Sequence, residues 1–324
     1  MNWYLGDGAP RSEAELATFR PIDRSYLDDP ANYRPTAAAR DAVNAALLLG
    51  MPLVISGEPG SGKTQLGYAV AHELGLGEPL LFVTKSTSQS RDLLYRYDAI
   101  RHFRASQVGE ASSAAEFIEL QPLGQAIQEA LPAKSRFNLG RGDLPPAPRR
   151  RLIIVDEIDK APRDFANDLL HEVDRLQFRI AELQTGESPP IDVAARPILF
   201  VTTNSEQLLP DAFLRRCAFV ALTPPQGAEL ARMITSRFGG MLSADHKLVE
   251  DAVQLSDRLR ASGQLERPPS SSELLQFLAA VLAAGGDAGR GLRDQPIALE
   301  RFATLLGKQT ADLGHIEREL STQP

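Results

Sequence analysis

Eight consecutive residues, 57–64, carry the clearest chemical pattern in the sequence. They read GEPGSGKT and match the pattern GxxxxGK[ST]. Glycines in such a loop let main-chain N–H groups turn inward around a phosphate, while the lysine ammonium faces the phosphates and the Thr hydroxyl binds Mg²⁺. The sequence therefore predicts a loop that binds a nucleotide. Its predicted binding residues are Gly57, Glu58, Pro59, Gly60, Ser61, Gly62, Lys63, Thr64 and the following Gln65.

A second chemical signal is the pair Asp156-Glu157, which ends the apolar run LIIV. An acid at the carboxyl end of a strand beside a phosphate loop can hold Mg²⁺, so we predict Asp156 and Thr64 as metal ligands. An adjacent carboxylate can polarise an attacking water, and Glu157 is the candidate general base.

Buried strands that alternate with helices must position these residues. A helical pattern at 36–49, with Thr36 as N-cap and Gly50 at its end, precedes the first short apolar run. The expected strands are 53–56, 80–84, 152–155, 198–202 and 218–222, and further helical patterns cover 64–74, 123–131 and 165–176. This alternation predicts an α/β domain with a parallel sheet sandwiched by helices.

The character of the chain changes near Pro224. Helical patterns at 228–238, 246–259, 272–284 and 297–306 follow without a strand, which predicts a small C-terminal α-helical domain. We therefore expect an N-terminal arm at 1–32, an α/β domain at 33–223 and a helical domain at 224–324. Two segments, 99–120 and 133–151, are not needed for a sheet of alternating strands and helices. The second is rich in Pro and Gly, and we expect it to be an exposed loop.

Composition excludes several classes. The chain has 324 residues and a formal net charge of −7, from 35 Lys and Arg against 42 Asp and Glu, which is the wrong sign for coating nucleic acid. A single cysteine, Cys217, rules out an internal disulfide framework. No apolar stretch is long enough for a membrane span and no signal peptide is evident, so we expect a cytoplasmic protein.

Further motifs resemble AAA+ ATPases, whose fold is that of P-loop NTPases with a helical lid. After the fourth predicted strand, ILFVTTN places Asn204 where these proteins carry the polar sensor 1. The string LPDAFLRRC resembles their arginine-finger segment, which inserts into the neighbouring subunit's site. The resemblance implies Arg216 as the finger, with Arg215 as the alternative.

Order and spacing are most similar to the MoxR branch of AAA+ proteins, across roughly residues 33–306. The supporting strings are GEPGSGKT, RDLLYRYDAIRHF, PLGQAI, VDEIDKAPRDFANDLLHEVD and RPPSSSELLQFL. The resemblance implies a helix 2 insert near 99–120 and a pre-sensor 1 hairpin at 178–194. The lid departs from the branch, because a serine near Ser271 or Ser272 stands where sensor 2 arginine is usual; Arg267 is the candidate substitute for binding nucleotide.

What the resemblance implies is a chaperone-type ATPase that uses ATP and Mg²⁺ to remodel or mature a protein client. It implies a ring, expected to be a hexamer, and a partner with a von Willebrand factor A domain. Three alternatives stay open: a DNA-directed motor or loader, a nucleotide switch with little turnover, and GTP in place of ATP. We expect neither nucleic acid nor a membrane as the partner, although the interleaved aromatic and basic residues of 94–104 could stack on single strands.

Overall fold

The computed structural model describes residues 12–13, 21–107, 113–139, 144–183, 186–204, 209–295, 297 and 299–321, without the side chains of 170 and 171. The chain divides into two compact units. One unit is Pro35–Thr223, and the other combines Met1–Arg34 with Pro224–Pro324. Within the described part of the chain, no helix has both the length and the apolar character needed to cross a membrane.

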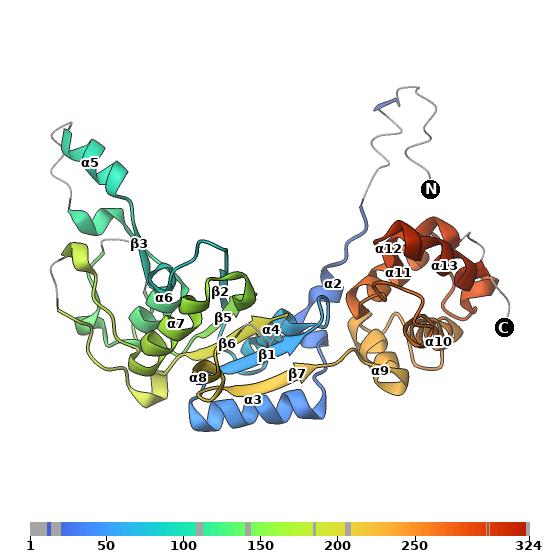
Figure 1. The fold of residues 1–324 in the computed structure, drawn as a ribbon, viewed down its shortest axis with the longest axis horizontal. Coiled ribbons are helices and arrows are strands. Elements are labelled where there is room, and N and C mark those ends of the chain that lie inside the picture. The colour runs from blue at the N-terminus through green and yellow to red at the C-terminus, as the bar shows by residue number, and fades with distance from the viewer. Residues whose placement is uncertain are drawn as a thin grey trace. The chain divides into compact units, whose positions relative to one another are not determined.

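A five-stranded parallel sheet forms the centre of the first unit (Figure 1). The strands are β1 (Leu53–Gly57), β2 (Leu80–Val83), β5 (Leu152–Asp156), β6 (Ile198–Thr203) and β7 (Ala218–Leu222). Their order is β2-β5-β6-β1-β7, so β6 lies between β5 and β1. The predicted parallel sheet is confirmed, and its three central strands are almost fully buried.

Helices cover both faces of this sheet, which explains why its strands are continuous apolar runs. The helices of this unit that flank the sheet are α3 (Ala37–Leu49), α4 (Lys63–Glu73), α6 (Pro122–Ala130), α7 (Arg163–Arg175) and the short α8 (Asp211–Leu214). Ile153 and Val155 pack in one core cluster with residues of α6 and α7. On the opposite face α4 lies so close that a Cβ on Gly67 would come within 2.6 Å of Ile154.

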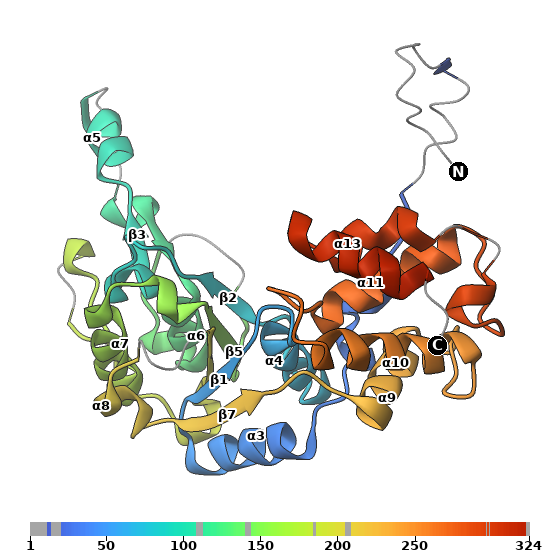
Figure 2. The same ribbon diagram turned by 45° about the vertical axis from the view of Figure 1, so that its right-hand side comes forward.

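Local signals set the ends of α3 as predicted. The Thr36 hydroxyl accepts a hydrogen bond from the Ala39 N–H, which satisfies one of the free donors at the helix start. Gly50 ends the helix with φ of 62°, a left-handed conformation that glycine adopts without a steric penalty. Figure 2 shows α3 alongside β7 before the chain enters β1.

The predicted helix 2 insert has a secondary structure that the sequence did not indicate. Strands β3 (Tyr95–Tyr97) and β4 (Ile118–Leu120) pair antiparallel, and α5 (Ala99–Gln107) lies between them in the chain. Both views place α5 away from the five-stranded sheet (Figures 1 and 2). The insert therefore begins four residues before 99, and residues 108–112 of the predicted range lie outside the described residues.

Two other expectations for this unit need correction. The predicted hairpin at 178–194 forms no β-ladder among its described residues. The Ser188 N–H donates to the Phe178 carbonyl, and short 3₁₀ turns lie at Ala181–Leu183 and Val193–Ala195. The segment 133–151 is not wholly an exposed loop, because Arg151 is buried. Its guanidinium contacts both carboxylate oxygens of the buried Glu129, at 3.0 and 3.2 Å.

The second unit is built of helices around its own apolar core. Its C-terminal part contains α9 (Gly227–Arg237), α10 (Lys247–Ala261), α11 (Ser271–Ala283), α12 (Ala303–Leu306) and α13 (Thr310–Ser321). The helix predicted at 297–306 is instead a 3₁₀ turn at Leu299–Phe302 followed by the single turn of α12. The sequence also missed α13, whose Ile316 and Leu320 complete the core.

Residues 21–34 correct the expected N-terminal arm, the rest of which is largely outside the described residues. This segment contains α2 (Ser25–Asp28), and it packs on α9. The Arg237 guanidinium donates to the Asp29 carbonyl and stacks over the Tyr33 ring, 5.0 Å from its centroid. The Ser236 hydroxyl donates to the Asn32 carbonyl. The end of the predicted arm is thus part of the helical unit.

Candidate nucleotide site at the carboxyl edge of the sheet

Three strand ends bring the predicted site residues together. In a parallel sheet all carboxyl ends meet at one edge, and β6 lies between β1 and β5. The phosphate-loop pattern follows β1, the acidic pair ends β5, and Asn204 follows β6. Residues from positions 57 to 204 are therefore neighbours in space.

Lys63 is the centre of this cluster. The residue is only 8% exposed, and its ammonium donates to the carbonyls of Gly57 and Glu58 at 2.8 and 3.0 Å. A third hydrogen bond of 2.9 Å reaches Asn204 Oδ1. Burial lowers the pKa of Lys63, and the nearby carboxylates, Asp156 first among them, oppose this shift.

Asp156 lies within hydrogen-bond distance of two hydroxyl groups. Thr64 Oγ1 donates to Asp156 Oδ1 at 2.8 Å, and Thr202 Oγ1 donates to the same oxygen at 2.6 Å. The predicted metal ligands Thr64 and Asp156 are thus adjacent, although they lie on different elements. A hydroxyl and a carboxylate are the hard oxygen donors that Mg²⁺ prefers.

Glu157 occupies an unusual main-chain conformation directly after β5. Its φ and ψ are 56° and 52°, in the left-handed region that non-glycine residues seldom occupy. The Glu157 N–H donates to Thr202 Oγ1 at 2.9 Å, and its carboxylate pairs with the Lys160 ammonium. Such strain persists only where surrounding contacts hold it, and it is concentrated at functional sites.

Asn204 is held from two sides. Its side-chain oxygen accepts from Lys63, and its N–H donates to Asp159 Oδ1 at 3.0 Å. Because an ammonium can only donate, the amide oxygen must face Lys63, and the amide nitrogen is left as the donor group of this side chain. This is the polarity that a sensor of phosphate or water requires.

The loop itself fits a phosphate chain. Gly60 and Gly62 have φ of 79° and 90°, and a Cβ on Gly57 would lie 2.6 Å from the Leu222 carbonyl. The Ser61 hydroxyl oxygen is buried and has no hydrogen-bond partner within the part of the chain that the structure describes. An unsatisfied buried hydroxyl inside a glycine cradle, beside a buried ammonium and the start of α4, suits an anionic ligand.

The other predicted binding residues of the loop differ in exposure. Glu58, Pro59 and Gly60 are exposed, and Gln65 is partly buried in the first turn of α4. The Glu58 carbonyl is one of the acceptors for Lys63. Main-chain groups therefore provide contacts in this loop. Such contacts do not depend on the side chain, which explains why the pattern tolerates any residue at its x positions.

Arg215 and Arg216 follow α8, and both are exposed. Arg216 Nη1 lies 3.4 Å from Asp174 Oδ2 of α7, and more than half of each side chain is accessible. An ion pair so exposed contributes only about 0–1 kcal/mol, so it would give way readily to another partner. A role for either arginine as a finger stays a prediction.

Arg267 belongs to the helical unit, where its side chain is exposed. The main-chain N–H groups of Glu266 and Arg267 donate to the buried carboxylate of Asp312. Ser271 and Ser272 lie in the first turn of α11, which Ser270 caps in a reciprocal box with Glu273. A role for Arg267 in binding nucleotide stays a prediction.

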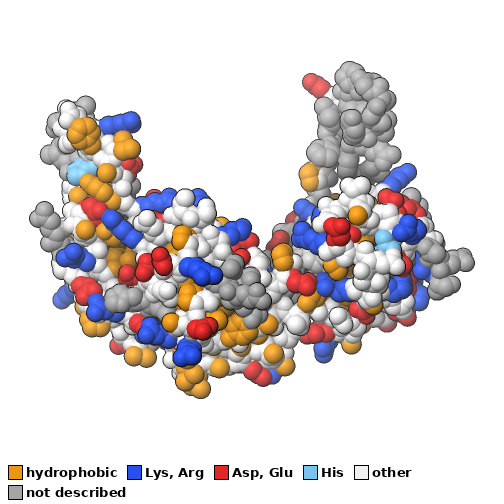
Figure 3. Space-filling view, in the orientation of Figure 1, with side chains coloured by type: hydrophobic (Ala, Val, Ile, Leu, Met, Phe, Trp, Pro, Cys, Tyr) orange, Lys and Arg blue, Asp and Glu red, His pale blue; other side chains and the backbone are white. Residues whose placement is uncertain are grey.

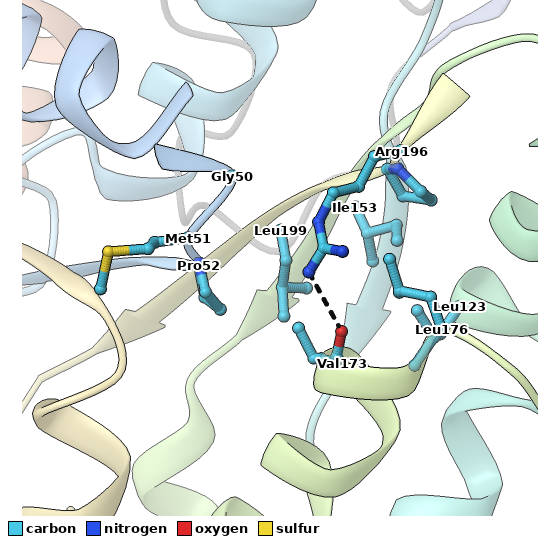
Figure 4. Close-up of a pocket in the computed structure, with 10 residues that line it drawn as sticks. Gly50, Met51, Pro52, Leu123, Ile153, Val173, Leu176, Arg196 and Leu199 are labelled. Atoms are coloured by element: carbon cyan, nitrogen blue, oxygen red, sulfur yellow. Dashed lines mark hydrogen bonds between the residues drawn. The ribbon is translucent and has the colours of Figure 1, made fainter. Parts of the chain in front are cut away.

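A pocket lies at the opposite, amino edge of the sheet (Figure 4). Gly50, Met51 and Pro52 precede β1 there, and Arg196 precedes β6. The Arg196 guanidinium donates to the Val173 carbonyl at 3.5 Å, the bond drawn in Figure 4. This pocket is mostly apolar and separate from the carboxyl edge, so it is not the nucleotide site.

Sequence reasoning missed three residues of the cluster: Asp159, Lys160 and Thr202. Their signals were present but weak. Asp159 and Lys160 directly follow Glu157 in VDEIDK, and Thr202 is a polar residue at the end of the apolar run ILFV. Only the pairing of β5 with β6 shows that they contact the predicted residues.

Comparison with known proteins agrees with this geometry. Residues 52–238 match the family model of the AAA domain, dynein-related subfamily. No curated protein matches the sequence significantly. AAA domains in general bind nucleotide, typically with Mg²⁺, and hydrolyse it. Since the match covers more than half of the 324 residues, including the whole cluster around Lys63, this chain belongs to the AAA domain family.

Proposed function

We propose that this protein is an ATP-hydrolysing, MoxR-like ring ATPase that remodels or matures a protein client. One observation carries the hydrolytic part of the proposal. At the carboxyl edge of the sheet, Lys63 is hydrogen-bonded to Asn204, and Thr64, Asp156, Thr202 and Glu157 form a second hydrogen-bonded set. The charges of Asp156 and Glu157 act on the Lys63 ammonium. A nucleotide switch with little turnover would not need a candidate base beside the metal ligands.

Each residue has a task that its contacts support. Lys63 binds the β- and γ-phosphates, and Glu157 orients the attacking water and takes its proton. The amide nitrogen of Asn204 donates to the water or the γ-phosphate. Mg²⁺, held by Thr64 and Asp156, would neutralise charge on the phosphates.

The assembly part of the proposal rests on Arg216. A guanidinium supplied by a neighbouring subunit would stabilise the charge that develops on the γ-phosphate, which makes hydrolysis depend on ring formation. The exposure of Arg216 and its weak pairing with Asp174 support this role, because the side chain is accessible to a neighbour. We propose a hexamer as the ring.

The client part of the proposal rests on α5. Among the described residues this helix has none that is buried, and Ile100 and Phe103 are 67% and 65% exposed. Arg101 and Arg104 lie on the same helix, and Figure 3 shows apolar and basic side chains side by side over this part of the insert. An exposed apolar pair on a projecting helix suits contact with a protein. We propose that the client, or a partner with a von Willebrand factor A domain, is bound there.

ATP turnover measured against protein concentration tests chemistry and assembly together. We expect specific activity to rise with concentration and to fall by about 10²-fold or more in Arg216→Ala, because a finger stabilises the transition state. Arg215→Ala should keep most activity if Arg216 is the finger. Arg301→Ala, which removes an exposed arginine of the helical unit, is the control for lost charge.

Turnover that is independent of concentration and insensitive to both arginines would contradict the shared site. Turnover stimulated by DNA at low salt and lost steeply with added salt would favour the DNA-directed motor instead. Repeating the assay with GTP shows whether the site prefers the adenine or the guanine nucleotide.

A further inference from the structure

Two reciprocal hydrogen bonds join the end of β5 to the end of β6. The Glu157 N–H, after β5, donates to the Thr202 side chain at 2.9 Å. The Asn204 N–H, after β6, donates to the Asp159 side chain at 3.0 Å. Thr202 of β6 and Asp159, in the turn Ile158–Lys160 after β5, thus each supply a side-chain acceptor for the main chain of the other segment.

These bonds begin where the regular ladder stops. The last paired residues of the two strands are Val155 and Val201. Beyond them the strands would diverge, and the N–H groups would lack the carbonyl acceptors that a ladder provides. Thr202 and Asp159 take over this task, and they continue the alignment of the two chains past the sheet.

The two main-chain positions held in this way belong to the candidate base and the candidate sensor. Glu157 has a left-handed main-chain conformation that persists only under external restraint. The Asn204 side-chain oxygen accepts from Lys63, which fixes one end of the amide group. The position of the amide nitrogen then depends on where the Asn204 main chain lies. A shift at either N–H would move a group that must meet the attacking water.

We propose that Asp159 and Thr202 are positioning residues that hold Glu157 and Asn204 at a fixed separation across the attacking water. This inference rests on the proposed ATP hydrolysis. Thr202 also donates to Asp156, so the same hydroxyl links the metal ligand to the base. We call these two bonds, Glu157 N–H to Thr202 and Asn204 N–H to Asp159, the clamp. Asp159 is the simpler of its two side chains to test, because its bond to Asn204 does not involve the hydroxyl that also contacts Asp156. Misplacing a reacting group by about 1 Å can cost on the order of a hundredfold in rate.

Asp159→Ala and Asp159→Asn separate positioning from charge. Asparagine keeps an oxygen acceptor for the Asn204 N–H but removes the charge near Lys63. We expect kcat to fall about tenfold or more in Asp159→Ala with ATP affinity within about threefold of wild type, because the clamp acts on geometry and not on uniform binding. Asp159→Asn should keep kcat within about threefold. Asp164→Ala, which removes an exposed carboxylate of α7, is the matched control.

A double variant tests whether Asp159 acts through the sensor. In an Asn204→Ala background, Asp159→Ala should lower kcat by less than about twofold further, because the group that it positions is gone. Equal damage by Asp159→Asn and Asp159→Ala would overturn the proposal by assigning the effect to charge. Unchanged kcat in Asp159→Ala, or full additivity with Asn204→Ala, would overturn it as well.

A readout without turnover examines the clamp itself. The sequence has six asparagines, so selective ¹⁵N-asparagine labelling gives few amide signals, and the Asn204 signal is identified by its loss in Asn204→Gln. We expect the Asn204 amide to exchange with solvent at least tenfold faster in Asp159→Ala than in wild type, and near the wild-type rate in Asp159→Asn. Equal exchange in all three proteins would refute the clamp. Absence of wild-type turnover would refute the proposed function alone. The exchange rate of the Asn204 amide would still show whether Asp159 holds that N–H.

Discussion

The Lys63 ammonium is a buried charge that three hydrogen bonds stabilise. Lys63 is a buried residue, and three oxygen acceptors contact its ammonium in place of water. Hydrogen bonds to a charged group contribute about 1.5–3 kcal/mol each, so these bonds offset the cost of burial. These bonds use all three ammonium protons, so one of them must be exchanged when Lys63 contacts a phosphate oxygen.

Glu157→Gln is the decisive substitution at the residue scale. Glutamine keeps the shape of the side chain but is not a base, so we expect kcat to fall by about 10²-fold or more while ATP binding stays within a few fold of wild type. Single-turnover kinetics and equilibrium binding of fluorescent ATP measure the two effects. Glu119→Gln, which changes the exposed residue of β4, is the control, and undiminished turnover in Glu157→Gln would assign the base to another residue.

At the scale of elements, close packing holds the insert on the α/β unit. Helix α6 contacts the 3₁₀ turn Ser90–Leu93, which leads into β3. Gly124 of α6 makes this approach possible, because a Cβ there would lie 1.9 Å from the Leu94 carbonyl oxygen. Main-chain atoms cannot move aside as a flexible side chain can.

Gly124→Ala should therefore destabilise the α/β unit. We expect a loss of about 2–3 kcal/mol, which corresponds to roughly 4–12 °C in the thermal midpoint of a unit of this size. Thermal unfolding followed by circular dichroism measures it. Gly186→Ala is the matched control, since no atom lies within 4 Å of a Cβ at that position. Equal midpoints for the two variants would show that α6 can shift away from Leu94.

At the scale of the whole molecule, one compact unit contains both ends of the chain, and the α/β unit is the part between them. Tyr33 and Arg237 are separated by most of the sequence, yet their side chains stack. Burial raises the pKa of Tyr33 to about 12, while the Arg237 charge opposes this shift. The neutral phenol is thus the form that the folded helical unit prefers.

This shift predicts a pH dependence of stability. The pKa of Tyr33 rises from 10.0 to about 12 on folding, so its contribution is fully present below pH 10 and is lost as pH rises through 12. Over that window the free energy of unfolding should fall by about 2–3 kcal/mol more in wild type than in Tyr33→Phe. Urea unfolding at pH 9, 10, 11 and 12 measures the difference, and parallel curves for the two proteins would contradict it.

The parts of this protein that depend on adjacent residues could be predicted from the sequence. The pattern at 57–64, the acids after LIIV and the polar residues after ILFV are contiguous strings, and the buried strands around them have simple apolar periodicity. Parallel strands place their carboxyl ends at one edge, so the acidic pair could be predicted beside the phosphate loop. The contact of Lys63 with Asn204 also needed β6 to lie next to β1.

The contacts between distant segments are evident only in the folded chain. The bonds of Asp159 and Thr202 need β5 and β6 to be neighbours, and β3 pairs with β4 across α5. The packing of residues 21–34 on α9 brings together segments that are far apart in the sequence, such as Asn32 and Ser236, 204 positions from each other. Local propensity carries no information on such pairs, because their energy comes from burial and hydrogen bonds that exist only after the chain has folded.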